Sequence, residues 1–523
     1  MGRHKDRDAF LKRELDRTLE TYGNHPSFIL MTMGNELRGN DEFLTALVEQ
    51  AKEKDPRRIY SSTSHHHRSK SDQFRITMRI GNEKIKKKGI KIRGLRGPKT
   101  DWDFADAIKD ENIPVIAHEI GQFCAWPDLS EIRQYRGLLK AKNFELFGDR
   151  LTQRGMKRQA RDFLMASGKL QAICYKEEIE SLMRTPDFGG FQLLDLHDFP
   201  GQGTSLVGVL NPYWKSKGYI TAREYRRFAG QTVPLARFEK RTWTNNETFT
   251  AQIDLSHFGQ HDLKKCKAEW KLIDISNRTI AKGKLPAINA PASSLTTIGQ
   301  ISINLSSIKE PSKLKLSVSI PSATASNDWN LWIYPNTTDD SEPENVYIAS
   351  SLDDKAITTL AKGGNVVMLP PIANINGRHE SWQPIFWNTQ WISRTGNRSL
   401  GLLCSSKHPA LADFPTDFHS DWQWHGLMNN SKTVNLAHTP EGLKPIVQVI
   451  PDWNNPQREA MIFECKVGKG NLLFCSADLT GDLQERTTAK QLRKSLLKYA
   501  AGESFEPKTE MSLSQIRSML ISM

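Results

Sequence analysis

The sequence HPSFILMTMGNEL, residues 25–37, is an apolar run that stops abruptly at Gly34, Asn35 and Glu36. A short continuous apolar run that ends in turn-forming residues is typical of a strand buried on both faces. The amide and the carboxylate then stand at the carboxyl end of the strand. Polar groups in that position predict a functional edge.

Three further strands are expected in the first 233 residues, with helices between them. The expected strands are RRIYSSTS (57–64), IPVIAHE (113–119) and GFQLLDL (190–196). Apolar residues at helical spacing predict helices at 8–22, from 41, at 131–147 and at 171–183. Continuous apolar strands that alternate with helices indicate a parallel sheet buried on both faces.

The pattern changes near residue 234, so several domains are expected. Short alternating segments separated by turn residues predict an antiparallel, immunoglobulin-like β-sandwich at 234–336. A polar linker at 337–345 follows, and the α/β pattern then returns. We therefore predict a partial barrel at 1–233, the sandwich at 234–336, an α/β domain at 337–503 and a tail at 504–523.

Composition limits the classes of protein. The formal net charge is +13, and much of the excess lies in the basic run at 83–99. This run lacks the aromatic residues of a single-strand binder and matches no DNA-binding motif, so a solvated surface is favoured over nucleic-acid binding. No apolar stretch has the length of a membrane span, and no secretory signal is visible.

Metal and disulfide chemistry is not expected. The six cysteines are scattered singly, without CxxC spacing. The run His65 to His67 has no chelating spacing and no evident carboxylate partner, so we predict no metal and no cofactor.

Two glutamates stand at predicted strand ends, Glu36 after the first strand and Glu119 at the end of the third. His65 and Asp195 end two other strands. Paired carboxylates at the carboxyl edge of a parallel barrel suit glycoside hydrolysis, in which one protonates the leaving oxygen and the other attacks or activates water. For a single glutamate the alternative is a helix cap or an ion pair.

The context of these glutamates resembles glycoside hydrolase family 2, the family of β-galactosidases, β-glucuronidases and β-mannosidases. HPSFILMTMGNEL resembles its acid/base signature, and PVIAHEIGQF resembles its nucleophile segment, 119 − 36 = 83 residues later. FGGFQLLDLHDFPGQGT (188–204) is similar to strand eight and its loop. The resemblance covers roughly residues 8–234 and implies strands four to eight of a (β/α)8 TIM barrel.

The resemblance also implies roles for individual residues. Glu36 would be the general acid/base and Glu119 the nucleophile of a retaining β-glycosidase acting on an oligo- or polysaccharide, and Asn35 would bind the 2-hydroxyl. Loop position makes further residues candidate sugar contacts: His65, His66, Trp102 and Asp195. The alternative for Trp102 is a place in the core.

The chain departs from the family pattern in two ways. No tyrosine lies between His67 and Glu119, where the family places a partner of the nucleophile. Barrel strands one to three and the preceding domains are also missing, so we expect an N-terminally truncated enzyme. Another polypeptide that supplies the missing strands is a candidate partner.

The last domain resembles glutamine amidotransferase-like or flavodoxin-like domains, but it lacks an elbow cysteine. We expect it to be non-catalytic. The main alternative to a glycosidase is a non-catalytic carbohydrate-binding or scaffold protein, and a nucleic-acid binder is the weaker one.

Overall fold

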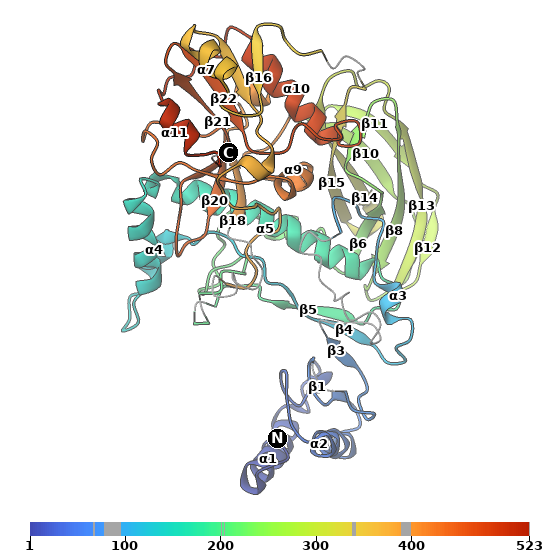
Figure 1. Ribbon diagram of the computed structural model, residues 1–523. Coiled ribbons are helices and arrows are strands. Elements are labelled where there is room, and N and C mark those ends of the chain that lie inside the picture. Colours follow the sequence, from blue (N-terminus) through green and yellow to red (C-terminus); the bar gives the residue numbers. More distant parts are fainter. Residues whose placement is uncertain are drawn as a thin grey trace. The chain divides into compact units, whose positions relative to one another are not determined.

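The computed structural model describes residues 1–65, 68–77, 96–199, 201–202, 204–336, 341–388 and 399–521 (Figure 1). His66, and the basic run as far as residue 95, lie outside the described residues. The chain is mixed α/β with several sheets. It divides into two compact units. Unit 1 is Met1–Ile92, Trp102–Gly121 and Glu178–Leu194, and unit 2 is Arg93–Asp101, Gln122–Glu177 and Asp195–Met523.

The described part of unit 1 contains five strands that follow one another in chain order and run parallel. β1 pairs with β2, and β4 lies between β3 and β5. Ser64, just after β2, bridges to both Asn35 and Ile76 and so links the two groups of strands. The strands are β1 (Leu30–Thr32), β2 (Ile59–Ser61), β3 (Arg75–Thr77), β4 (Val115–Gly121) and β5 (Gly190–Leu194).

Two helices of unit 1 pack together and cover β2. α1 (Lys5–Tyr22) and α2 (Asp41–Lys54) bury Leu15, Leu19 and Val48 around Tyr60. The Asn40 side chain caps α2 by accepting from the Phe43 backbone N–H. Unit 1 also contains the short helix α3 (Ala105–Ile108).

Several local predictions need correction. The helix predicted at 131–147 is wrong: a 3₁₀ turn (Leu129–Gln134) and a separate helix, α4 (Lys142–Gln153), enclose an irregular loop. Gly137 and the exposed Leu138 and Leu139 occupy that loop, so apolar spacing there did not mark a buried face. α5 starts eleven residues before the predicted 171, at Ala160 (Ala160–Met183).

Strand lengths also differ from those expected. The apolar run 28–33 supplies only the three residues of β1. β3 was not predicted, because three residues are too few to show a period. No helix in the described parts of the chain combines the length and the apolar composition needed to cross a membrane.

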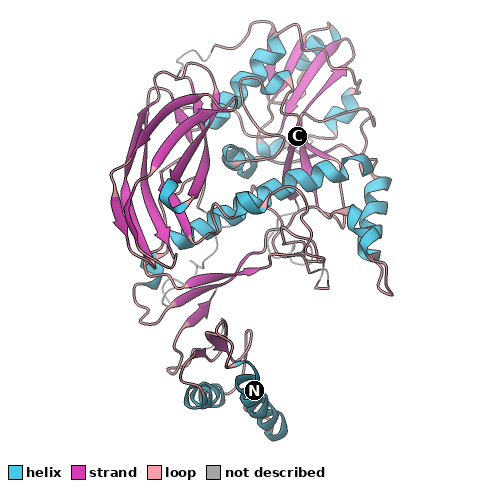
Figure 2. Ribbon diagram, turned by 180° about the vertical axis from the view of Figure 1, so that it is seen from behind, coloured by secondary structure: helices cyan, strands magenta, loops and turns pink. Residues whose placement is uncertain are grey.

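Within unit 2, two antiparallel sheets share one core (Figure 2). Phe249, Ile253 and Leu255 on β8 contribute to the same core as Leu316 and Trp329 on the other sheet. The first sheet is β13 (Ser294–Asn304), β8 (Thr248–His257) and β6 (Thr232–Arg237). The second is β11 (Thr279–Lys284), β10 (Glu269–Asp274), β14 (Ser312–Ile320), β15 (Ala325–Tyr334) and β7 (Thr242–Thr244), where β7 joins in parallel. β12 (Ile288–Ala290) pairs with β9 (Leu263–Cys266).

The C-terminal part of unit 2 is a mixed sheet flanked by helices. Strands β16, β17 and β22 are parallel, whereas β22, β21, β20 and β18 pair antiparallel. The strands are β16 (Val346–Ala349), β17 (Asn365–Met368), β18 (Ser399–Cys404), β19 (Val434–Asn435, paired with β21), β20 (Val447–Pro451), β21 (Glu459–Val467) and β22 (Gly470–Cys475). The helices are α6 (Ala222–Tyr225, before the sandwich), α7 (Asp354–Ala361), α9 (His425–Asn429), α10 (Thr487–Ala501) and α11 (Leu513–Arg517).

The core of the C-terminal sheet extends to earlier parts of the chain. Phe123, Leu170 and Cys174 belong to the same buried cluster as Leu402 and Leu473. The segment predicted as a tail contributes Phe505, Met511 and Ile516 to the buried clusters. This sheet therefore does not close its core with residues 337–503 alone.

All six cysteines are buried and free. Burial raises the pKa of the Cys475 thiol to about 12, and it also raises the pKa of Cys404 and Cys465. A thiol in this state is a poor nucleophile, because the reactive thiolate is disfavoured. Cys475 ends β22 and has the environment of a core residue.

One carboxyl group is buried at a stability cost. Glu131 is fully buried in the 3₁₀ turn, and neither of its carboxyl oxygens has a hydrogen-bond partner among the described residues. Burial, with the nearby charge of Asp198, raises its pKa to about 8. Glu131 therefore holds its proton more tightly in the folded than in the unfolded chain.

We predict that Glu131→Gln removes a pH dependence. As pH rises from about 4.5 to about 8, the unfolded carboxyl ionises before the folded one, so the free energy of unfolding falls. The neutral variant should be more stable than the wild type by a few kcal/mol near pH 8, and the difference should vanish near pH 4.5. Urea denaturation at several pH values measures this, and a difference that is constant with pH would contradict it.

Candidate functional site

The turn that carries Glu36 is fixed to the end of β2. The Glu36 backbone N–H donates to the carbonyl oxygen of Ser64 at 3.1 Å, and Ser64 N–H donates to the Gly34 carbonyl at 3.2 Å. The next residue, Leu37, donates its N–H to Thr63 Oγ1 at 2.9 Å. Glu36 therefore occupies a defined place at the carboxyl end of β1.

Asn35 is held by the same serine. Ser64 Oγ donates to Asn35 Oδ1 at 2.5 Å and accepts from the Glu36 N–H at 3.2 Å. Asn35 and Glu36 are both exposed. The hydroxyl thus orients the Asn35 amide while leaving the residue accessible.

Glu119 lies on β4, the central strand of the β3–β4–β5 sheet. Its Oε1 is 3.3 Å from Nε2 of the buried His118. The other ring nitrogen, His118 Nδ1, lies 3.0 Å from Gln192 Oε1 on β5. Gln192 therefore orients the ring that contacts Glu119.

The pKa of His118 is raised above its usual value. Burial alone would lower this pKa, but contacts with Glu119 and Gln192 and the charges of Glu119 and Glu36 outweigh burial. The two carboxylates thus favour the protonated ring, and in that form the ring places a positive charge beside Glu119. A positive charge at this distance stabilises an ionised carboxylate.

The two predicted carboxylates come together. One carboxyl oxygen of Glu36, one of Glu119 and one ring nitrogen of His118 all lie within 4.8 Å of one another. Glu36 follows β1, and Glu119 lies two residues before the end of β4. Parallel strand order therefore brings residues 83 positions apart (119 − 36) to one edge.

The backbone is strained at three of the predicted residues. Glu36, His65 and Glu119 have φ angles of 49°, 63° and 50°, in the left-handed region that residues other than glycine rarely adopt. Such residues cost about 1–3 kcal/mol each and cluster at functional sites. The His65 ring stacks near His118, with ring centroids 6.5 Å apart.

The remaining predicted contacts are placed differently. Trp102 is 8% exposed in the core of unit 1, edge-on to Phe104 at 5.5 Å and beneath the Arg184 guanidinium. Asp195 begins a segment of unit 2, where its Oδ2 lies 3.7 Å from His197 Nε2. The structure thus brings together Glu36, Glu119, Asn35 and His65 within unit 1. The role of each residue stays a prediction.

Sequence reasoning missed His118 and Gln192. His118 directly precedes Glu119 in the sequence, and this adjacency could have indicated His118 as a site residue. Alternation along a strand would place His118 on the opposite face, but the left-handed turn at Glu119 brings both side chains together. Gln192 had no signal, because its role depends on the register of β4 against β5.

Glu36, His118 and Glu119 could also share a cation, since two carboxylates and an imidazole are suitable ligands. Catalytic carboxylate pairs have the same close spacing. The spacing alone therefore does not assign a metal.

Comparison with known proteins gives two family matches, both described as domains of unknown function. DUF8488 matches residues 247–335, and DUF8487 matches residues 347–521. No curated protein matches the chain. Both family matches lie outside unit 1.

Several solved structures are similar at low identity. An FMN-binding β-glucuronidase from Facaelibacterium prausnitzii L2-6 is 12% identical (TM-score 0.30), over 65% of this chain and 46% of that one. An exo-chitosanase from Amycolatopsis orientalis is 13% identical, with a TM-score of 0.35, over 62% of this chain and 39% of that one. A putative β-galactosidase from Bacteroides fragilis is 14% identical, with a TM-score of 0.29, over 64% of this chain and 45% of that one. This chain spans less than half of each, and at these scores the similarity carries no argument.

The strain at Glu36 gives a test of the site. In the left-handed region alanine costs about 1–2 kcal/mol, which glycine avoids. We predict that Glu36→Gly is more stable than Glu36→Ala by about 1 kcal/mol. For the matched control, Glu49 in the middle of α2, glycine should instead be less stable than alanine by about 1 kcal/mol. Urea denaturation measures both pairs, and the same order at both positions would contradict the strained turn.

Proposed function

We propose that the chain carries the catalytic carboxylates of a retaining β-glycosidase, with Glu119 as nucleophile and Glu36 as general acid/base. The observation that carries the proposal is that carboxyl oxygens of these two residues lie within 4.8 Å of each other. Retaining enzymes need carboxyl groups about 5–5.5 Å apart, whereas inverting enzymes separate them by about 6.5–9.5 Å to admit water.

The proposed reaction has two displacements. In the first, a Glu119 oxygen attacks the anomeric carbon, the glycosidic C–O bond breaks, and the Glu36 proton passes to the leaving oxygen. In the second, Glu36 takes a proton from water, the water oxygen attacks the anomeric carbon, and the Glu119 carboxylate is released. One sugar–oxygen bond is thus hydrolysed by one water.

Neighbouring residues support these roles. A nucleophile must stay ionised, and the protonated form of His118 beside Glu119 favours that state. Gln192 orients the His118 ring, and we propose that His118 acts as the partner of the nucleophile in place of the tyrosine expected from the resemblance. Asn35, oriented by Ser64, is the proposed partner of the sugar 2-hydroxyl.

The strand order favours the same proposal. Five parallel strands in chain order, with functional residues at their carboxyl ends, are what consecutive strands of a (β/α)8 barrel supply. We propose that β1–β5 are strands four to eight of such a barrel. Paired carboxylates in this sequence context imply hydrolysis of a glycosidic bond, and a β-linked oligo- or polysaccharide is the proposed substrate class here.

We also propose that the flavodoxin-like or amidotransferase-like C-terminal domain is non-catalytic. The support is the burial of Cys404, Cys465 and Cys475, which leaves no accessible thiol there among the described residues. Its contribution is structural, through the core that it shares with α5.

We predict that the protein hydrolyses aryl β-glycosides with retention of anomeric configuration. NMR of the first-formed sugar measures that configuration. Glu119→Gln should abolish turnover. Glu36→Gln should slow substrates with poor leaving groups far more than activated ones, because the latter need little protonation. Glu42→Gln, an exposed change on α2, is the control and should leave the rate unchanged.

The outcomes separate the alternatives. An inverted product would exclude Glu119 as nucleophile. Sugar binding without turnover would instead favour the non-catalytic carbohydrate-binding protein, and equal rates for Glu119→Gln and the wild type would reject the site.

The edge of β1 indicates where a further polypeptide strand could pair with this chain. Among the described residues β1 pairs with β2 only, and the adjacent Ile29 is 60% exposed. An unpaired apolar edge is a template for another strand. We propose that a further polypeptide strand pairs here.

We predict that the purified chain self-associates through this edge. Ile29→Lys should raise the soluble, monomeric fraction, because a lysine on an edge opposes strand addition. Ile275→Lys, at a residue 78% exposed in a turn of the sandwich, is the matched control. Sedimentation of both variants measures the effect, and equal behaviour of the two would remove the edge as its cause.

A further inference from the structure

We infer that Trp214 of unit 2 is a carbohydrate-binding platform, at which the ring stacks on one face of a pyranose of a β-linked oligosaccharide. The ligand class rests on the proposed function, but binding at Trp214 needs no turnover. The evidence is the exposure of this ring, the way its loop is held, and the polar groups around it.

Exposure of the Trp214 ring and the conformation of its backbone both cost free energy. Trp214 is 62% exposed, and its φ angle of 61° lies in the left-handed region, which is an outlier for a bulky residue. Exposing a large ring forgoes the free energy of burying it. A residue that is both strained and exposed is a candidate for function.

Hydrogen bonds to one side chain and its backbone hold the loop that carries Trp214. Asn211 Oδ1 accepts from the backbone N–H of Tyr213 and of Lys215, each at 3.0 Å. The Asn211 backbone also accepts from Trp214 N–H and donates to the Lys215 carbonyl, both at 2.9 Å. Four hydrogen bonds to the nearly buried Asn211 thus fix five residues, and a ring on such a loop loses little entropy when it binds.

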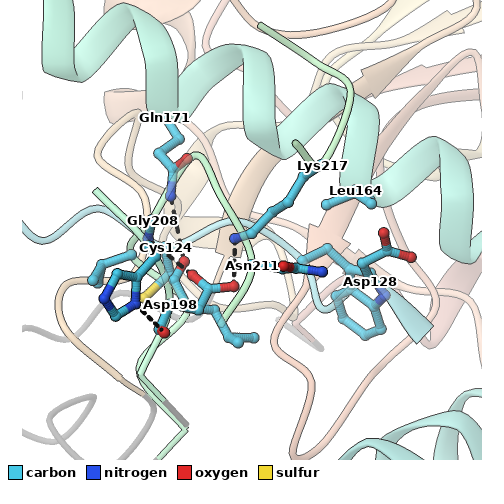
Figure 3. A network of polar contacts seen from close by, with 12 residues as sticks. Cys124, Asp128, Leu164, Gln171, Asp198, Gly208, Asn211 and Lys217 are labelled. Carbon is cyan, nitrogen blue, oxygen red and sulfur yellow. Dashed lines mark hydrogen bonds and ion pairs between the residues drawn. The ribbon is translucent and has the colours of Figure 1, made fainter. Parts of the chain in front are cut away.

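A buried ion pair supports this loop (Figure 3). Asp198 Oδ2 lies 2.6 Å from Lys217 Nζ, and both side chains are 1% exposed. Asp198 Oδ1 also accepts from the Gly208 N–H at 2.9 Å. Such a pair adds little net stability, but it fixes geometry, and here it ties residue 198 to residue 217 on either side of the platform.

Polar groups flank the ring. The His197 ring lies 4.7 Å from the Trp214 ring, and its Nδ1–H donates to the Asp198 carbonyl at 2.8 Å. That hydrogen bond places a proton on Nδ1 of His197. The other ring nitrogen, Nε2, lies 3.7 Å from Asp195 Oδ2. Tyr213, 42% exposed, lies beside Trp214 in the chain.

This composition fits a sugar better than a protein surface. A pyranose has one small apolar face of C–H groups and a rim of hydroxyls. The electron-rich face of an indole attracts such C–H groups, and Asp195, His197 and Tyr213 can exchange hydrogen bonds with the hydroxyls. A protein partner would need a larger apolar surface than one indole ring with polar neighbours.

The test measures binding in a Glu119→Gln background, so that no probe is consumed. Cellohexaose, xylohexaose, mannohexaose, β-1,4-galactohexaose and chitosan hexamer are titrated by calorimetry. At least one should bind, and Trp214→Ala should weaken that binding about ten-fold or more. Trp214→Phe, which keeps a smaller ring, should fall between alanine and tryptophan.

Controls separate recognition from folding. Phe258→Ala, at a sandwich residue 55% exposed, should leave binding unchanged. Asn211→Ala should weaken binding while Trp214 is present but add nothing to Trp214→Ala, because Asn211 only positions the ring. Thermal unfolding confirms that each variant is folded.

Two results would overturn the inference: none of the five probes binds, or a folded Trp214→Ala binds as tightly as the parent. Failure of the proposed function is distinct from both. In that case the wild type would not hydrolyse aryl glycosides, yet the Trp214-dependent binding would persist.

Discussion

Parallel pairing between the ends of β1 and β2 is the interaction on which the candidate site depends. The Ser64 hydroxyl donates to the Asn35 side chain and accepts from the Glu36 backbone N–H, and Ser64 also bridges to Ile76 at β3. Because the strands are parallel, Glu36, which follows β1, and Glu119, near the end of β4, reach the same edge. The left-handed turns at Glu36 and Glu119 cost free energy, and the surrounding hydrogen bonds hold the chain in that conformation.

Unit 2 uses buried polar groups in a similar way. The Asp198–Lys217 pair and Asn211 contribute order more than stability, since desolvation offsets much of their attraction. Both hold the loop that carries the exposed Tyr213 and Trp214. In both units, then, unfavourable terms such as strain and buried charge lie next to the residues with proposed roles.

The sequence was most informative where chemistry and local pattern coincide. Glu36 and Glu119 could be predicted as a pair because each closes an apolar run in a distinctive motif, and their carboxyl oxygens do lie close together. His118 and Gln192 were missed, since their contacts depend on strand register, which one sequence does not reveal. The helix expected at 131–147 failed because apolar spacing was taken as burial, whereas Leu138 and Leu139 are exposed in a loop.

The shared core of unit 2 has a consequence for how the chain could have evolved. Phe123, Leu170 and Cys174 are covered by the C-terminal sheet, and the residue after Phe123, Cys124, donates its N–H to the Ile385 carbonyl. Gene recombination in the polar segment 337–345 would separate these partners and leave an apolar surface exposed to water on both products. The C-terminal sheet is therefore not a portable module, and it is expected to be inherited together with α5 as one folding unit.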